Sequence, residues 1–123
     1  MNPDIALWSA AGLSALWCGV HVIVGERDVA RPLRHSTTLD PLARDTAFLC
    51  WHLVSGSLAF LTVLFALGVT VSPHYAIAGT LLAGAFVVVG FILPRLIAVS
   101  YRRLPQGWLF VPVVALGLWG VWG

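Results

Sequence analysis

The stretch "TAFLCWHLVSGSLAFLTVLFALGVTV" (residues 46–71) decides the fold of this chain. It carries no charged side chain, and its apolar residues run on without the strict alternation of a half-buried β-strand. A helix needs about 20 mostly apolar residues to cross the roughly 30 Å hydrocarbon core of a bilayer. The length and composition of this stretch therefore predict a membrane-spanning helix.

The whole chain has the same character. Of its 123 residues, 59% are hydrophobic and 10% are charged, and the mean hydropathy is +0.93. A soluble domain carries about 25% charged residues, and a small domain has too little interior to hide so much apolar surface. We therefore expect an all-α integral membrane protein whose main partner is the lipid bilayer.

Three further apolar runs predict three further helices. We expect one domain over residues 1–123, a four-transmembrane-helix antiparallel bundle with spans at about 5–24, 46–71, 75–93 and 108–122. Asn2-Pro3, Asp40-Pro41 and Ser72-Pro73 each place a capping side chain directly before a proline, which is typical of a helix start. Three other prolines argue for interruptions: Arg31-Pro32 in the first connection, and Pro94 and Pro112, which should kink or end their helices.

The positive charges predict the orientation. All seven basic residues are arginines, and they fall in or beside two connections, residues 25–45 and 94–107. The positive-inside rule places both connections in the cytoplasm and both termini outside, N-out and C-out. The use of arginine without lysine, with much alanine and glycine, is typical of GC-rich bacteria and suggests a bacterial inner (plasma) membrane. The net charge of +2, without a basic stripe, argues against a nucleic-acid partner.

Two histidines lie inside the predicted spans. Because neighbouring spans run antiparallel, His21 and His52 fall at a similar depth, about 6–8 Å from the cytoplasmic edge at 1.5 Å per residue. Each belongs to a polar stripe at helical spacing. The simplest packing turns these two stripes toward each other. The candidate metal ligands are His21, His52 and Cys18, and the supporting residues of the site are Ser14, Trp51, Ser55, Arg44 and Asp45.

Four roles fit such a pair of histidines. The imidazoles are suited to axial ligation of a b-type haem, or to a metal site completed by Cys18, which shares a helix face with His21. A titrating histidine also suits a quinone, a lipid headgroup or a proton site, which Arg44 and Asp45 would join at the helix mouth. The fourth role is structural, a hydrogen bond across helices.

The sequence therefore supports two hypotheses about function. The first is a small polytopic membrane protein with a histidine-centred site (haem b, metal or quinone) near the cytoplasmic leaflet, between the first two helices. The alternative is an accessory subunit of a larger membrane complex, or a homo-oligomer, because the third and fourth spans have few polar residues. No motif of a metalloprotease, phosphate loop or nucleophilic enzyme is present. The sequence therefore neither predicts nor excludes enzymatic activity.

Overall fold

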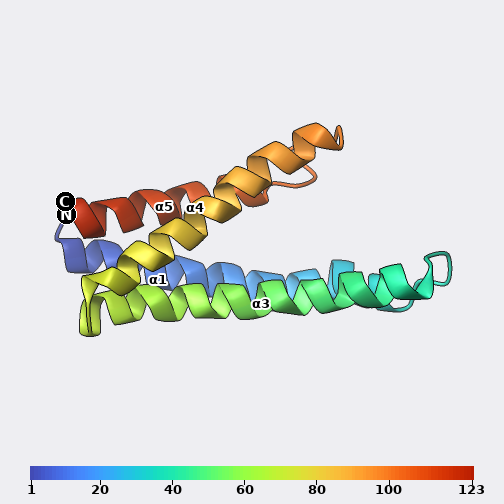
Figure 1. Ribbon diagram of the computed structural model, residues 1–123, viewed down its shortest axis with the longest axis horizontal. Coiled ribbons are helices and arrows are strands. Elements are labelled where there is room, and N and C mark those ends of the chain that lie inside the picture. The colour runs from blue at the N-terminus through green and yellow to red at the C-terminus, as the bar shows by residue number, and fades with distance from the viewer.

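The computed structural model describes residues 1–123 and is entirely helical. The first helical rod joins three elements end to end, and three single helices follow it (Figure 1). In chain order the elements are α1 (Pro3–Val20), η1 (His21–Ala30), α2 (Arg31–Arg34), α3 (Pro41–Thr70), α4 (Pro73–Leu96) and α5 (Gln106–Trp122). The predicted all-helical class is confirmed.

Three of the four rods begin where the sequence predicts. Asn2 accepts a hydrogen bond from the backbone N–H of Asp4 at 2.9 Å, and Asp40 accepts one from Leu42 at the same distance. Ser72 caps α4 in the same way. In each case a side-chain oxygen pairs a backbone donor that the first helical turn leaves free. The fourth rod, α5, starts after Pro105 without a side-chain cap.

The rods form a square in which each contacts two antiparallel neighbours. The rod that starts with α1 packs against α3 and α5, and α4 packs against the same two. Short connections produce this arrangement, because consecutive helices joined by a few residues must reverse direction. Both termini lie together at one end (Figure 1), where the indole N–H of Trp119 donates to the carbonyl of Met1 at 2.8 Å.

The first connection is much shorter than expected. We predicted a polar link over residues 25–45 with no unbroken helix through Arg31-Pro32, but the rod continues to Arg34 and leaves only residues 35–40 outside helices. The reason is the π-helix η1, in which Arg31 N–H donates to the carbonyl of Glu26, five residues back. We infer that these wider turns move aside the carbonyl that the ring of Pro32 would otherwise meet.

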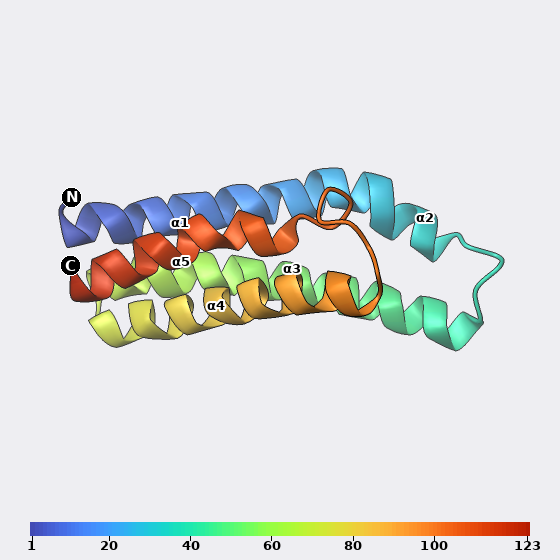
Figure 2. The same ribbon diagram turned by 90° about the horizontal axis from the view of Figure 1, so that it is seen from above.

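The two rods on either side of this connection extend beyond the other two (Figure 2).

Two further prolines also fail to end their helices: Pro94 lies inside α4, which continues to Leu96, and Pro112 lies inside α5. Three rods are long and apolar enough to cross a membrane, with 32, 30 and 24 residues, whereas α5 has 17. The prediction of four membrane-length helices is thus confirmed for three of them.

The buried core is concentrated in the half of the bundle that holds the termini. Only 20 of 123 residues are buried. Most of them face one another there, and small residues on α1 and α4 let the helices approach closely. The largest side chains that are fully buried in this core are Phe65, Leu61 and Val113. Toward the arginine-containing end α4 diverges from α3 (Figure 1), and this divergence opens the interior.

Candidate functional site

A cavity of about 570 Å³ occupies the opened half of the bundle. Its walls come from the junction of α1 with η1, from α3, from α4 and from the start of α5. Thirteen of its twenty lining residues are hydrophobic, and no arginine is among them. The polar or glycine positions in its wall include His21, Gly25, Asp28, Trp51, Gly90 and Gln106.

The ring of His21 lies against the indole of Trp51 in this wall. The two rings stack with their centroids 4.0 Å apart and their planes 15° from parallel. The His21 Nε2 atom is 3.3 Å from the backbone carbonyl of Trp51. Because a carbonyl only accepts, Nε2 is the donor in this contact, and in the neutral tautomer that makes it Nδ1 carries an acceptor lone pair. His21 is thus a cavity-lining residue that has an acceptor nitrogen in this tautomer.

Gly25 makes this arrangement sterically feasible. A Cβ atom at this position would lie 2.6 Å from Cζ2 of Trp51, closer than any side chain tolerates. Gly25 is one helical turn beyond His21 on the same face, so the indole lies over the glycine and beside the imidazole. The local sequence His21-x-x-x-Gly25 thus forms the seat for an aromatic side chain from the neighbouring helix.

The indole N–H of Trp51 has no hydrogen-bond partner although it is buried. It is the only buried side-chain nitrogen or oxygen atom in residues 1–123 with this property. A buried donor without an acceptor costs about 1–3 kcal/mol, and such groups are rare in folded proteins. A ligand oxygen that accepts a hydrogen bond from the indole N–H of Trp51 would therefore bind favourably.

The predicted stripe on the first span faces α3. Cys18 Sγ lies 3.9 Å from the carbonyl of Ser55, and His21 contacts the carbonyl of Trp51 one turn away. Ser14 is fully buried and donates to the carbonyl of Ala10 within its own helix. Trp17, which also lines the cavity, donates to the carbonyl of Leu109 at 2.9 Å and so ties α1 to α5.

On α3 the contact face differs by one residue from the expected stripe. Trp51 and Ser55 face the first rod, whereas His52 is exposed and packs edge-on against Phe48 with ring centroids 4.6 Å apart. One residue rotates a helix by about 100°, so adjacent positions cannot share a face. Trp51, rather than His52, is the residue of α3 that contacts His21.

The donors predicted for a metal or haem do not converge in this geometry. Nε2 of His21 and Sγ of Cys18 each contact a carbonyl of α3, and His52 lies exposed against Phe48. Across residues 1–123 no group of three His, Cys, Asp or Glu side chains is placed to hold a metal ion. Axial haem ligation needs two imidazoles aimed at one iron, and His21 is stacked on Trp51 instead.

Asp45 joins the two protruding rods through Arg34, and neither Arg44 nor Asp45 lines the cavity. Arg44 Nε lies 2.9 Å from Asp45 Oδ1, and Arg34 Nη1 reaches the same oxygen at 3.3 Å. Arg34 also lies over the ring of Phe48, 5.7 Å from its centroid. These contacts hold the end of α2 against α3. The acidic residue in the cavity wall is Asp28, which pairs with Arg27.

Half of the cavity wall had no signal in the sequence. The residues from α4, the connection after it and α5 are mostly apolar, and the sequence of these spans contains no motif or polar stripe that indicates a site. Their position in the wall depends on how α4 and α5 cross, which helical periodicity does not encode. These residues are Phe86, Val89, Gly90, Leu93, Pro94, Leu104, Pro105, Gln106, Leu109 and Phe110.

Comparisons of the chain with models of protein families, with curated proteins and with solved structures found no match in any of the three.

Proposed function

We propose that the chain is a multi-pass protein of a bacterial inner membrane, with its arginine-containing end in the cytoplasm and both termini outside. The exposed apolar surface supports this proposal, since long side chains such as Ile23, Leu53 and Leu81 are 72%, 61% and 70% exposed. A protein surrounded by water rarely exposes apolar area on this scale. Trp108, Trp119 and Trp122 are exposed near helix ends, as in the aromatic belts of membrane proteins.

We further propose that the cavity binds a neutral, lipid-soluble molecule with a polar ring, of which a quinone is the model. The observation that carries this proposal is the cavity itself, apolar in most of its wall and polar at His21 and Trp51. Its volume of about 570 Å³ lies within the roughly 300–1,000 Å³ of small-molecule sites. The absence of arginine from its lining favours a neutral head over a phosphate.

The polar groups of the wall suit the two redox forms of such a ring. A quinone carbonyl would accept from the Trp51 N–H, which has no partner. A quinol hydroxyl would donate to Nδ1 of His21, because Nε2 is held by the Trp51 carbonyl. The indole N–H is covered by its neighbours, so the side chain has to shift slightly as the oxygen approaches. The apolar tail of the ligand would extend between the diverging helices into lipid.

Ligand titration tests the proposal directly. We would titrate the detergent-purified protein with a short-chain ubiquinone analogue and follow the fluorescence of Trp17 and Trp51, which line the cavity. Saturable quenching is expected, with affinity reduced at least about tenfold by Val54→Phe, which fills the cavity. Val63→Phe is the matched control, because Val63 is exposed on the same helix outside the cavity. Equal affinities in both variants would refute the cavity as the site.

Cysteine labelling tests the orientation. In a variant without Cys18 and Cys50 we would place one cysteine at Thr37, in the first connection, or at Gly123. A membrane-impermeant maleimide should label Gly123→Cys in intact cells and Thr37→Cys only after lysis. The reverse pattern would invert the proposed topology, and labelling of both in intact cells would contradict membrane insertion of the bundle.

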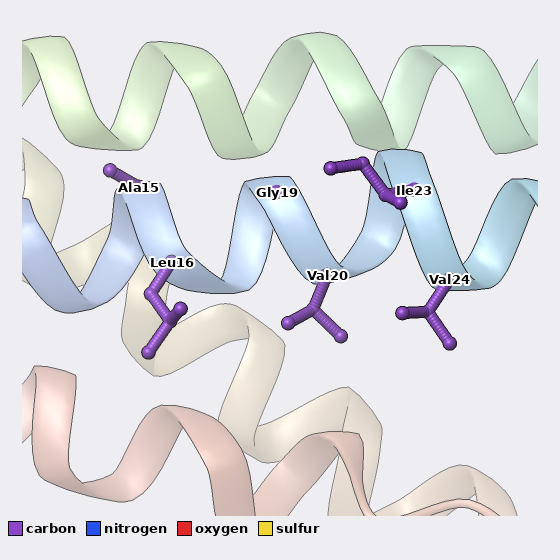
Figure 3. A pocket seen from close by; sticks show the side chains of 6 residues that line it. All are labelled: Ala15, Leu16, Gly19, Val20, Ile23 and Val24. Atoms are coloured by element: carbon purple, nitrogen blue, oxygen red, sulfur yellow. The ribbon is translucent and has the colours of Figure 1, made fainter.

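A hollow of about 360 Å³ on the surface of the first rod, across the junction of α1 with η1, favours the alternative function, an accessory subunit or homo-oligomer. Figure 3 shows Leu16, Val20 and Val24 in one row along the rod, with Ala15, Gly19 and Ile23 in the next. Small residues in such a face allow another helix to approach closely. The molar mass of the protein in detergent tests this reading. A Gly19→Leu variant that stays in the same assembly as the parent would argue against this face.

A further inference from the structure

The end of α4 and the connection to α5 contribute Leu93, Pro94 and Leu104 to the cavity wall and also carry a group of charged residues outside it. This segment carries Arg95, Arg102 and Arg103, which are all exposed and which we call the basic patch. None of the three lines the cavity. Residues 46–123 contain no aspartate or glutamate, so no acidic side chain from this part of the chain neutralises them.

Three of the four arginines around the first connection form ion pairs, and Arg31 does not. Arg27 pairs with Asp28, and Arg34 and Arg44 both pair with Asp45. These pairs are exposed and contribute little stability, but they occupy the guanidinium groups. The structure contains no ion pair for any arginine of the basic patch. The two basic segments at this end of the bundle therefore differ in how readily they bind an external anion.

The backbone around the basic patch is held in place. The hydroxyl of Tyr101 donates to the carbonyl of Phe91 at 2.9 Å, and the ring of Phe91 packs edge-on against both Tyr101 and Trp108. Arg95 lies over the Tyr101 ring, 5.9 Å from its centroid. An anchored segment loses less conformational entropy on binding than a mobile one. The arginines are thus presented from an ordered turn.

The surroundings of the basic patch are apolar and exposed. Leu96, Ile97 and Trp108 are 75%, 52% and 58% exposed. Cationic groups next to exposed leucine, isoleucine and tryptophan match a lipid, whose phosphate and acyl chains lie side by side at the membrane surface. A soluble anion would use only the charged half of this surface. The combination favours a lipid over free phosphate.

We propose that the basic patch is a binding site for the phosphate of an anionic phospholipid such as phosphatidylglycerol. Arginine suits this role because its planar guanidinium donates two parallel hydrogen bonds to a phosphate. The proposal rests on the membrane location proposed above, but not on the ligand of the cavity. Loss of quinone binding would leave it intact, and loss of lipid selectivity would leave the cavity proposal intact.

The test compares two triple variants with the same change in net charge. The first is Arg95→Gln/Arg102→Gln/Arg103→Gln, and the matched control is Arg27→Gln/Arg34→Gln/Arg44→Gln. Native mass spectrometry of the purified full-length protein would count bound phosphatidylglycerol and phosphatidylcholine at equal concentrations. Glycerol phosphate, which has the phosphate without acyl chains, would serve as the soluble competitor.

We expect the parent and the control variant to prefer phosphatidylglycerol. In the first variant this preference should fall by at least about tenfold, since each arginine near an anionic lipid surface raises the binding constant on the order of fivefold. Equal losses in both variants would show that net charge alone attracts the lipid and would overturn the site. Displacement of the lipid by equimolar glycerol phosphate would overturn the choice of a lipid. Circular dichroism of both variants would verify that they are folded.

Discussion

His21 stacks on Trp51 with ring centroids 4.0 Å apart, and its Nε2 donates to the carbonyl of the same residue at 3.3 Å. This double contact joins the first rod to α3 at the edge of the cavity. His52, the next residue along α3, has no such role and packs on Phe48. The two histidines that looked equivalent in the sequence therefore occupy different environments.

Alanine substitutions should separate the two histidines. His21→Ala removes a stacked ring and a hydrogen bond between helices, and we expect it to lower the free energy of unfolding by about 1–3 kcal/mol. His52→Ala removes an exposed side chain and should change this free energy by less than about 0.5 kcal/mol. Reversible unfolding in mixed detergent, followed by circular dichroism, measures both. Similar losses in the two variants would contradict the different roles.

Gly25 should tolerate no larger side chain. A Cβ atom there would meet the Trp51 ring at 2.6 Å, so Gly25→Val should push the indole off His21 and narrow the cavity. We expect destabilisation of about 1–3 kcal/mol from overpacking, together with a shift in tryptophan emission. Gly12→Val is the control, since a Cβ at Gly12 meets no atom within 4 Å. If the two variants behave alike, the close contact of Gly25 is not formed in solution.

The crossing of α4 and α5 depends on two facing glycines. A Cβ at Gly90 would lie 2.5 Å from the Cα of Gly107, so the backbones are in direct contact. Gly90→Ala should therefore separate the helices and lower the free energy of unfolding by about 1–3 kcal/mol.

Gly84, on the same helix, supplies the comparison for this prediction. A Cβ there would meet nothing within 4 Å. Gly84→Ala should raise the free energy of unfolding by up to about 1 kcal/mol, because alanine restricts the unfolded chain. We therefore expect Gly90→Ala to lower the free energy of unfolding and Gly84→Ala to raise it. Stabilisation by both variants would refute the contact between Gly90 and Gly107.

Ala98 holds a backbone conformation that glycine adopts more easily. Its φ of 54° lies in the left-handed region, directly after α4. Val99 N–H donates to the carbonyl of Pro94, and Ala98 N–H to that of Arg95, so the turn completes the hydrogen bonding of the helix end. Ala98→Gly should stabilise the protein by about 1 kcal/mol, the cost of this conformation for a residue with a side chain.

Ala85→Gly is the control for Ala98→Gly, because Ala85 is exposed inside α4. There glycine should destabilise the protein by about 0.5–1 kcal/mol. Thermal unfolding of both variants in the same detergent gives the comparison. A loss of stability with Ala98→Gly would show that the left-handed turn is not populated.

The sequence by itself determined the helices, three of their caps and the segregation of charge. These features are local: a run of apolar residues, an oxygen beside free N–H groups at Asn2 or Asp40, and arginines confined to two segments. Each depends on neighbours within one or two turns, so composition and spacing were enough to predict it. Pro32 and Pro94 do not end their helices as a local rule predicts, and before Pro32 we infer that the wider turns of η1 relieve the clash.

The tertiary structure decided which residues of these helices meet. A step of one residue rotates a helix by about 100°, and it is this step that brings Trp51 rather than His52 to His21. The cavity likewise follows from the divergence of α4 from α3 and from the contact of Gly90 with Gly107, which are far apart in the chain. Such relationships depend on how side chains of different helices pack, and no periodicity within one helix records them.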